Sequence, residues 1–346
     1  MKIKVLIVDD SAIIRGVIRA IIDEQPDMMV VGEAPDPLVA RDLIRDLKPD
    51  VLTLDVEMPH MNGLSFLKRL MRLKPMPVVM LSTHTQEGSD VAFRALGMGA
   101  VDFIGKPAPG EVNSGEYSRL IADKIRGAFA AKDSLEQLDL TLAADEERVF
   151  TPLAGPPASE SVLAIAAGTG GAEALRNVLS PLPADGPPTL VVTDMQPSFV
   201  KHFVKRLGEG TAMRVKVAEH DEPILPGIIY IAPGGLHLRV HQHGARGLGL
   251  TLDEDAPVND RRPSADVLFQ SVADAVGADA VGLILTGMGA DGARGLLALR
   301  KAGGRTIAQD ESTSLVFGMP RAAIEVGAVD VGTPLPQIAV EIQQGK

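Results

Sequence analysis

Three aspartates near the N-terminus are the residues best suited to chemistry, because each directly follows an apolar segment. Asp9 and Asp10 follow residues 3–8, and Asp55 follows residues 51–54. If both segments are parallel strands, their carboxyl ends meet at the crevice where open α/β sheets bind ligands. Three carboxylates crowded there repel one another unless a hard divalent cation neutralises them, and Mg²⁺ is the natural choice.

Two further polar residues fit the same edge of the predicted sheet. Ser82 directly follows the apolar residues 78–81, and Lys106 comes shortly after the predicted strand at residues 101–104. A hydroxyl and an ammonium at the rim that holds the metal would bind the oxygens of a phosphoryl group. Each residue alone could be an ordinary loop residue. Their joint placement at strand ends predicts a site for a phosphoryl group.

The segments between these residues alternate between strand and helix patterns. Ile18 and Ile22 belong to a helical stripe that begins at Ile13. Asp36 is placed to cap a helix that has Pro37 at its first position. A last helix is expected at about residues 117–130. The predicted strands are residues 3–8, 28–31, 51–54, 78–81 and 101–104. This order predicts a five-stranded, doubly wound parallel sheet.

The motifs VLIVDDS, LTLDVEMPHMNG, VVMLST and AVDFIGKP lie within residues 1–130, and this segment resembles the receiver domain of response regulators, a flavodoxin-like fold. The resemblance implies that Asp55 accepts phosphate from a histidine kinase. It also implies that Asp10, Asp55 and the backbone carbonyl of Glu57 hold Mg²⁺, with Asp9 assisting.

The same resemblance implies a conformational switch in this domain. Ser82 and Phe103 would move together when the domain is phosphorylated, and Lys106 would contact the phosphoryl group. Composition alone assigns Phe103 to the core. Its position three residues before Lys106 favours the switch role.

A second domain is expected after a linker. Residues 131–160 are first charged and then rich in Pro, Gly and Ser, as linkers are. Residues 161–346 resume the alternation of strands and helices. The strand candidates there are VLAIAA, TLVVTDM, GIIYIAP, AVGLILTG and RTIAQD. We therefore predict a second doubly wound, mostly parallel α/β domain.

Several motifs of the second domain could do chemistry. AIAAGTGGAEAL and LTGMGADGARG each run from a strand through a Gly-rich turn into a helix, where backbone N–H groups can form an oxyanion hole. The first is not a G-x-G-x-x-G dinucleotide motif. With RPSADVLF and GMPRAA, they resemble the catalytic domain of the chemotaxis methylesterase family (CheB) over about residues 160–346. Members of that family remove methyl esters from glutamates of methyl-accepting chemoreceptors, often deamidate receptor glutamines, and use a Ser–His–Asp triad.

Only one member of that triad is carried over to this chain. Gly168 occupies the serine position in AAGTGG, and Asp194 occupies the histidine position in VVTDMQPSF, whereas Asp291 is retained. Glycine has no side chain to form an acyl-enzyme, and an aspartate with an ordinary pKa of about 3.9 is a poor general base. The resemblance therefore predicts a catalytically degenerate domain, a pseudoenzyme.

Substitute catalytic residues are the alternative to degeneracy. Thr169 could replace the nucleophile, and His220 or His237 could supply a base, although each is more often a structural residue. Asp194 and Asp291 could also share a proton or bind a cation across the cleft, but two solvated acids too far apart to interact are preferred.

Three functions remain open at this point. The favoured one is a non-catalytic chemotaxis regulator, and the second is an active methylesterase and glutamine deamidase with displaced catalytic residues. A transcription factor is the third, but a net charge of −11 and no basic run argue against nucleic-acid binding. No apolar stretch is long enough to span a membrane. The chain contains no cysteine, which fits a cytoplasmic location and excludes thiolate chemistry.

Overall fold

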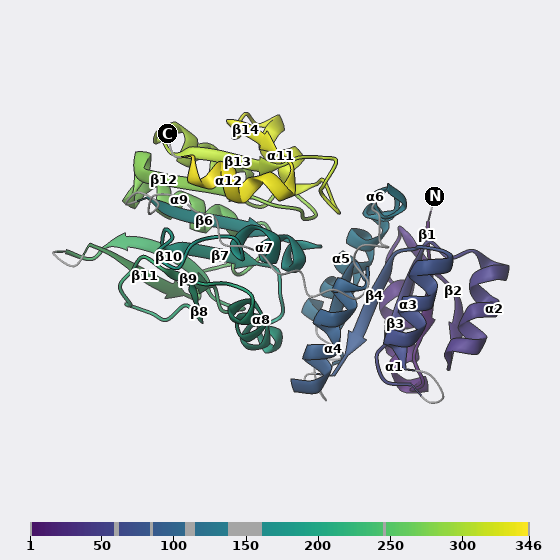
Figure 1. The fold of residues 1–346 in the computed structure, drawn as a ribbon. Coiled ribbons are helices and arrows are strands. Elements are labelled where there is room, and N and C mark those ends of the chain that lie inside the picture. The colour runs from purple at the N-terminus through teal and green to yellow at the C-terminus, as the bar shows by residue number, and fades with distance from the viewer. Residues whose placement is uncertain are drawn as a thin grey trace. The chain divides into compact units, whose positions relative to one another are not determined.

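The computed structural model describes residues 2–58, 62–83, 86–107, 115–137, 161–244 and 247–344. The chain divides into two compact units, Met1–Glu147 and Arg148–Lys346, and each is considered by itself (Figure 1).

The described part of the N-terminal unit contains a five-stranded parallel sheet in the order β2-β1-β3-β4-β5 (Figure 1). Its strands are β1 (Ile3–Val8), β2 (Met28–Ala34), β3 (Val51–Asp55), β4 (Val78–Ser82) and β5 (Asp102–Gly105). The helices are α1 (Ala12–Asp23), α2 (Pro37–Leu47), α3 (Gly63–Leu73), α4 (Gln86–Gly97), α5 (Gly115–Ala130) and α6 (Lys132–Gln137). Helix α1 contacts α5, and α3 contacts α4, as expected when helices cover both faces of a sheet. The predicted doubly wound fold is confirmed.

Short polar side chains begin the helices of this unit. The Asp36 carboxylate accepts hydrogen bonds from the Leu38 and Val39 N–H groups, at 2.8 and 3.0 Å, at the start of α2. Asn62 caps α3 in the same way. The predicted buried stripe of α1 is wrong at its first position. Ile13 is 78% exposed, because the part of α1 that faces the core begins further along the helix.

The predicted linker at residues 131–160 begins with a short helix. Its first part forms α6, and Leu135 of this helix is buried. Sequence analysis did not predict this helix, because Leu135 is its only apolar residue and one apolar residue gives no helical periodicity. Residues 138–160 of the predicted linker lie outside the described residues.

The C-terminal unit contains a seven-stranded parallel sheet in the order β14-β13-β12-β6-β7-β9-β8 over its described residues, with a separate antiparallel pair, β10–β11 (Figure 1). The strands are β6 (Val162–Ala167), β7 (Thr189–Thr193), β8 (Arg214–Val217), β9 (Ile228–Ile231), β10 (His237–Gln242), β11 (Leu248–Asp253), β12 (Ala280–Ile284), β13 (Arg305–Gln309) and β14 (Val331–Thr333). The helices are α7 (Gly171–Leu179), α8 (Pro197–Glu209), α9 (Ala265–Ala275), α10 (Ala293–Lys301), α11 (Met319–Glu325) and α12 (Ile338–Gln343), with 3-10 turns at Gly277–Asp279 and Leu335–Gln337.

Sequence analysis identified the inner strands of this sheet and missed its edges. The predicted segments correspond to β6, β7, β9, β12 and β13. The missed strands β8 and β14 are the two edge strands, and both are short and only partly buried. An edge strand needs no continuous apolar run, because one of its sides has no partner strand.

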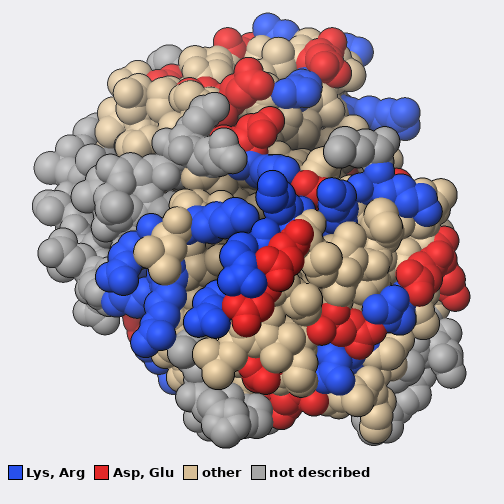
Figure 2. Space-filling view, turned by 90° about the vertical axis from the view of Figure 1, so that its right-hand side faces the viewer, with Lys and Arg blue, Asp and Glu red and all other residues tan. Residues whose placement is uncertain are grey.

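Charged side chains of both signs are intermixed on the face shown in Figure 2. Helix α2 contains such a group, in which Arg45 lies 2.7 Å from Asp46 and 3.5 Å from Asp42. Exposed pairs of this kind contribute little to stability. Among the described residues, no helix combines the length and apolar character needed to cross a bilayer.

One ion pair of the N-terminal unit is buried, which makes its loss costly. Lys124 Nζ lies 2.8 Å from Asp102 Oδ2, and both residues are buried. Lys124→Met leaves the Asp102 carboxylate without its cation inside the core, so we expect a loss of about 3 kcal/mol in the free energy of unfolding, measured by urea denaturation. Lys132→Met is the control, because Lys132 is 42% exposed where it pairs with Asp50, and should cost at most about 1 kcal/mol. Equal losses would contradict this assignment.

Candidate functional site

The three N-terminal aspartates meet at the carboxyl end of the first sheet. Asp9 follows β1 and Asp55 ends β3, and one carboxylate oxygen from each of Asp9, Asp10 and Asp55 lies within 4.8 Å of the others. Asp9 and Asp55 are buried, whereas Asp10 is exposed. The structure thus brings together the carboxylates that strand order predicted to be neighbours.

Lys106 supplies the positive charge that faces these carboxylates. Its Nζ lies 2.8 Å from Asp55 Oδ2 and 3.0 Å from Asp9 Oδ2. Burial by itself lowers the pKa of Lys106, but the contacts with Asp55 and Asp9 outweigh it and raise that pKa above its usual value. One ammonium group cannot neutralise three carboxylates, so the site keeps an excess of negative charge. Carboxylate oxygens in such a site are the ligands that hard divalent cations bind.

The ionised form of Asp55 is destabilised in this arrangement. Burial is the largest cause that raises its pKa, and the neighbouring Asp9 charge raises it further, whereas Lys106 lowers it. The result is a pKa of about 6 instead of 3.8. A carboxylate held this way gains from any cation that approaches it.

The other predicted residues of this site lie beside Asp55 or on β4 and β5, the next two strands of the sheet. The Glu57 N–H donates to Asp55 Oδ1 at 3.2 Å, so the backbone at 57 is beside the acid. Ser82 is buried at the end of β4, and its hydroxyl donates to the Thr83 carbonyl at 3.4 Å. Phe103 in β5 is buried, and its ring packs edge-on against Phe93, with 5.2 Å between centroids.

Sequence analysis missed the role of one glycine at this site. A Cβ atom on Gly63 would lie 2.1 Å from the Asp55 carbonyl oxygen. Only glycine therefore lets the start of α3 approach the chain beside Asp55. The Asn62-Gly63 pair in the sequence was the available signal, since such pairs mark tight turns.

The three residues that sequence analysis assigned to the triad positions line one small pocket of the C-terminal unit. Gly168 follows β6, Asp194 follows β7, and Asp291 lies between β12 and α10, so all three stand beyond the carboxyl ends of neighbouring strands. Arg261 and Met288 also line the pocket. Arg261 is a cationic residue that sequence analysis did not select, although it stands at the start of the RRPS segment.

The space beside Gly168 nearly accommodates a side chain. A Cβ atom there would lie 3.0 Å from the Gly287 Cα, 3.2 Å from the Met319 sulfur and 3.6 Å from the Met288 backbone nitrogen. The first two contacts are tight by a few tenths of an ångström. A serine at position 168 thus requires a small shift of its neighbours and would stand close to a backbone N–H.

The Asp291 side chain accepts hydrogen bonds from residues at the start of α9. Its Oδ1 accepts hydrogen bonds from the Ser264 hydroxyl at 2.6 Å and the Asn259 side-chain amide at 2.8 Å. Its Oδ2 accepts from the Ala265 N–H at 2.7 Å. A carboxylate at a helix N-terminus satisfies donors that the helix leaves unpaired, so Asp291 is oriented and stabilised in this position.

None of the three candidate substitute residues lines this pocket. Thr169 is buried and its carbonyl accepts from the Thr286 hydroxyl at 3.0 Å. His237 is buried, with Nδ1 accepting from the Ser264 N–H and Nε2 facing the Ala256 carbonyl, both at 3.2 Å. His220 is exposed and contacts the Leu252 backbone. Among the described residues that line the pocket, there is no serine and no histidine.

Two family models match this chain, one for each unit. Residues 163–342 match the CheB methylesterase model, and residues 5–113 match the response regulator receiver domain model.

Curated relatives match the chain over nearly its whole length. The protein-glutamate methylesterase/protein-glutamine glutaminase of Bordetella pertussis (strain Tohama I) is 52% identical over 344 residues, 99% of this chain and 96% of the relative. The protein of the same name from Chromohalobacter salexigens is 53% identical, covering 94% of this chain and 91% of the relative. Among solved structures, the Thermotoga maritima CheB methylesterase catalytic domain is 34% identical with a TM-score of 0.52, covering 54% of this chain and 98% of that domain.

The raised pKa of Asp55 predicts a specific pH dependence in metal-free buffer. The folded chain holds the Asp55 proton more tightly than the unfolded chain, so this group's contribution to stability is complete below pH 3.8 and is lost as pH rises through about 6. Asp55→Asn cannot ionise and should be more stable than wild type by about 1–2 kcal/mol at about pH 8, with a smaller difference at about pH 5. Urea denaturation in EDTA measures this difference.

The matched control is Asp23→Asn, since Asp23 is exposed on α1. A stability difference between wild type and Asp55→Asn that does not change with pH would contradict the assignment of burial as its cause.

Proposed function

The chain belongs to the CheB methylesterase family, and from this premise we propose a chemotaxis response regulator in which phosphorylation on Asp55 controls a receptor-modifying domain. Its substrates are glutamyl side chains of methyl-accepting chemoreceptors, and its phosphodonor is a histidine kinase. The observation that carries the proposal is the presence, in one chain, of a buried Asp55 paired with Lys106 and of a CheB-type cleft.

Asp55 is the phosphoryl acceptor in this proposal. A carboxylate oxygen of Asp55 attacks the phosphorus of the donor, the bond from phosphorus to the donor's histidine nitrogen breaks, and an acyl phosphate forms. Lys106 stays beside the new phosphoryl oxygens and offsets their charge. Ser82 and Phe103 would then rearrange around Lys106 as the switch.

Mg²⁺ fits the residues of this site. Asp10, Asp55 and the backbone carbonyl of Glu57 would hold the ion, with Asp9 assisting, because three carboxylate oxygens already lie within 4.8 Å of one another. When bound, Mg²⁺ supplies the positive charge that lets a crowded carboxylate accept an anionic group. The protein's own contribution is to destabilise the negative charge of Asp55, because burial and the nearby Asp9 charge both raise the pKa of Asp55.

Hydrolysis of receptor methyl esters and amides is the first candidate activity of the C-terminal cleft. The relatives that match nearly the whole chain are named protein-glutamate methylesterase/protein-glutamine glutaminase, which favours this activity. Gly168 offers no hydroxyl, so the attacking group there must be water. A water oxygen bonds to the ester carbonyl carbon, and one water proton passes to the Asp194 carboxylate. The Asp194 carboxyl group then gives this proton to the methoxy oxygen as the bond from that oxygen to the carbonyl carbon breaks, which releases methanol and leaves the glutamyl acid.

The second candidate function is recognition of receptor glutamyl groups without cleavage. It is favoured by one specific observation, namely that Gly168 and Asp194 line the pocket in which a serine and a histidine would be needed. In serine hydrolases, loss of the nucleophile lowers kcat by on the order of 10⁶, while binding and the oxyanion hole retain about 10³-fold catalysis over water. The two candidates therefore differ in a measurable residual rate.

Phosphorylation is the direct test of the regulatory site. We expect incubation with radiolabelled acetyl phosphate and Mg²⁺ to label the chain, because Asp55 accepts the phosphoryl group, and Asp55→Ala to abolish labelling. Asp46→Ala is the control, since Asp46 is exposed on α2, and should label as wild type does. Label retained by Asp55→Ala would refute the assignment.

Methanol release from methylated receptor membranes tests the cleft. We expect slow release by the phosphorylated wild type, and release at least about 100-fold faster by Gly168→Ser/Asp194→His, because a nucleophile and its base act as a unit. Gly168→Ser alone is the matched control and should gain much less. Release at the uncatalysed rate by wild type, with activity in the double variant, would select recognition without cleavage. Wild-type release as fast as that of the double variant would instead require another nucleophile.

A further inference from the structure

A second group of metal-ligating side chains lies on the β10–β11 pair, outside both sites described above. One ligand atom from each of Asp221, His241 and His243 lies within 4.8 Å of the others. None of the three lines the pocket around Gly168. Two imidazoles and one carboxylate are the donor types that borderline divalent transition metals such as Zn²⁺ prefer.

The strand pairing holds the two imidazoles side by side. His241 lies in β10 directly opposite Gly249 of β11, and His243 follows β10, where its backbone N–H donates to the Gly247 carbonyl at 2.7 Å. A Cβ atom on Gly249 would lie 2.8 Å from His243 Nδ1 and 3.0 Å from His241 Nε2. Both rings therefore occupy the space that a side chain at position 249 would fill, and glycine is what lets their nitrogens converge.

The backbone also fixes Asp221 against this pair of strands. Asp221 adopts a left-handed conformation with φ of 61°, and its N–H donates to the Leu250 carbonyl at 2.9 Å. The next residue accepts the Leu250 N–H at 3.0 Å through the Glu222 carbonyl. Asp221 is thus joined to β11 next to Gly249, although it is far from the histidines in sequence.

Two of the three distances between the ligand atoms match the coordination of a small tetrahedral ion, and the third is within 4.8 Å. His241 Nε2 lies 3.3 Å from His243 Nδ1, and His243 Nδ1 lies 3.4 Å from Asp221 Oδ1. Two ligands that each stand about 2.0–2.1 Å from Zn²⁺ at the tetrahedral angle are about 3.3–3.4 Å apart. A hydrogen bond between the two imidazoles would also give the first distance, so binding must be tested directly.

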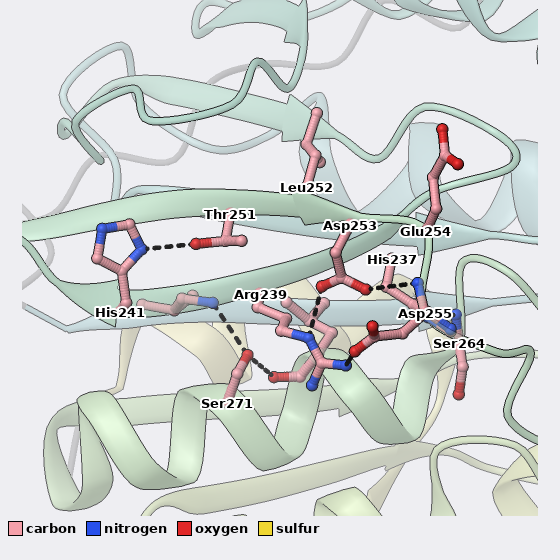
Figure 3. A network of polar contacts seen from close by, with 12 residues as sticks. His237, Arg239, His241, Thr251, Leu252, Asp253, Glu254, Asp255, Ser264 and Ser271 are labelled. Carbon is pink, nitrogen blue, oxygen red and sulfur yellow. Dashed lines mark hydrogen bonds and ion pairs between the residues drawn. The ribbon is translucent and has the colours of Figure 1, made fainter.

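A neighbouring hydroxyl orients the first imidazole. Thr251 Oγ1 lies 2.9 Å from His241 Nδ1 (Figure 3), whereas His243 approaches the other ring nitrogen, Nε2. If the hydroxyl accepts the Nδ1 proton, the Nε2 lone pair points towards His243 and Asp221. Metal-bound histidines are commonly held by such a partner on their other nitrogen.

We propose that Asp221, His241 and His243 bind one Zn²⁺-class divalent ion, which clamps the chain at Asp221 to the β10–β11 pair. The fourth coordination position faces solvent, since the Asp221 side chain is 67% exposed while that of His243 is only 15% exposed. With carboxylate and imidazole donors already converged by the backbone, binding requires little rearrangement of the chain.

Calorimetric titration of the metal-free full-length chain with Zn²⁺ tests the proposal, with millimolar Mg²⁺ present to occupy the aspartates of the receiver domain. We expect one Zn²⁺ per chain in wild type and affinity lowered at least about tenfold in His243→Gln. Gly249→Ala should weaken binding without removing a ligand, because the new methyl group displaces both rings. Substituting Co²⁺ should give the intense visible absorption of a tetrahedral site in wild type only.

His220→Gln is the matched control, because His220 precedes Asp221 in the chain but is not part of the cluster. It should bind Zn²⁺ as wild type does. Equal affinity and stoichiometry in wild type and His243→Gln would overturn the proposal, and so would equal loss in His220→Gln. If His243→Gln has lost its native circular dichroism, Asp221→Asn replaces it, since its exposed side chain can change without disturbing the fold.

Discussion

The crowding of Asp9, Asp10 and Asp55 around a single ammonium is the interaction on which the N-terminal unit depends. Two of these carboxylates are buried, and the ion pairs from Lys106 leave part of their charge uncompensated. The pKa of Asp55 rises to about 6 for this reason. The ionised form of an acid in this state is stabilised by an added cation, so the charge at the end of β3 depends on what binds there.

The C-terminal unit uses the same architectural rule for a different site. Parallel strands deliver Gly168, Asp194 and Asp291 to one edge of the sheet, where they line a common pocket. Asp291 has a structural task besides any catalytic one, because it accepts hydrogen bonds at the start of α9. These hydrogen bonds hold the Asp291 carboxylate in the pocket, where Gly168 and Asp194 are the other two residues assigned from the sequence.

The cleft and the β10–β11 cluster show different relations between sequence and site. Gly168 and Asp194 were found from the sequence because their flanking residues belong to recognisable motifs. Asp221, His241 and His243 have no such motif, since the carboxylate is twenty residues before the first histidine and joins it only through backbone pairing to Leu250. The close approach of the two imidazoles also depends on Gly249, because a side chain at that position would occupy the space of both rings. Only the structure shows this contact.

The sequence by itself determined the doubly wound architecture of both units, because buried parallel strands need continuous apolar runs such as those of β1, β3 and β12. It also placed the aspartates at strand ends, since strand order fixes which ends meet. Only the tertiary structure decided the edge strands β8 and β14, the helix α6 and the partners of Asp291. Those features depend on contacts between residues far apart in the chain, and neither an apolar run nor a local motif records such contacts.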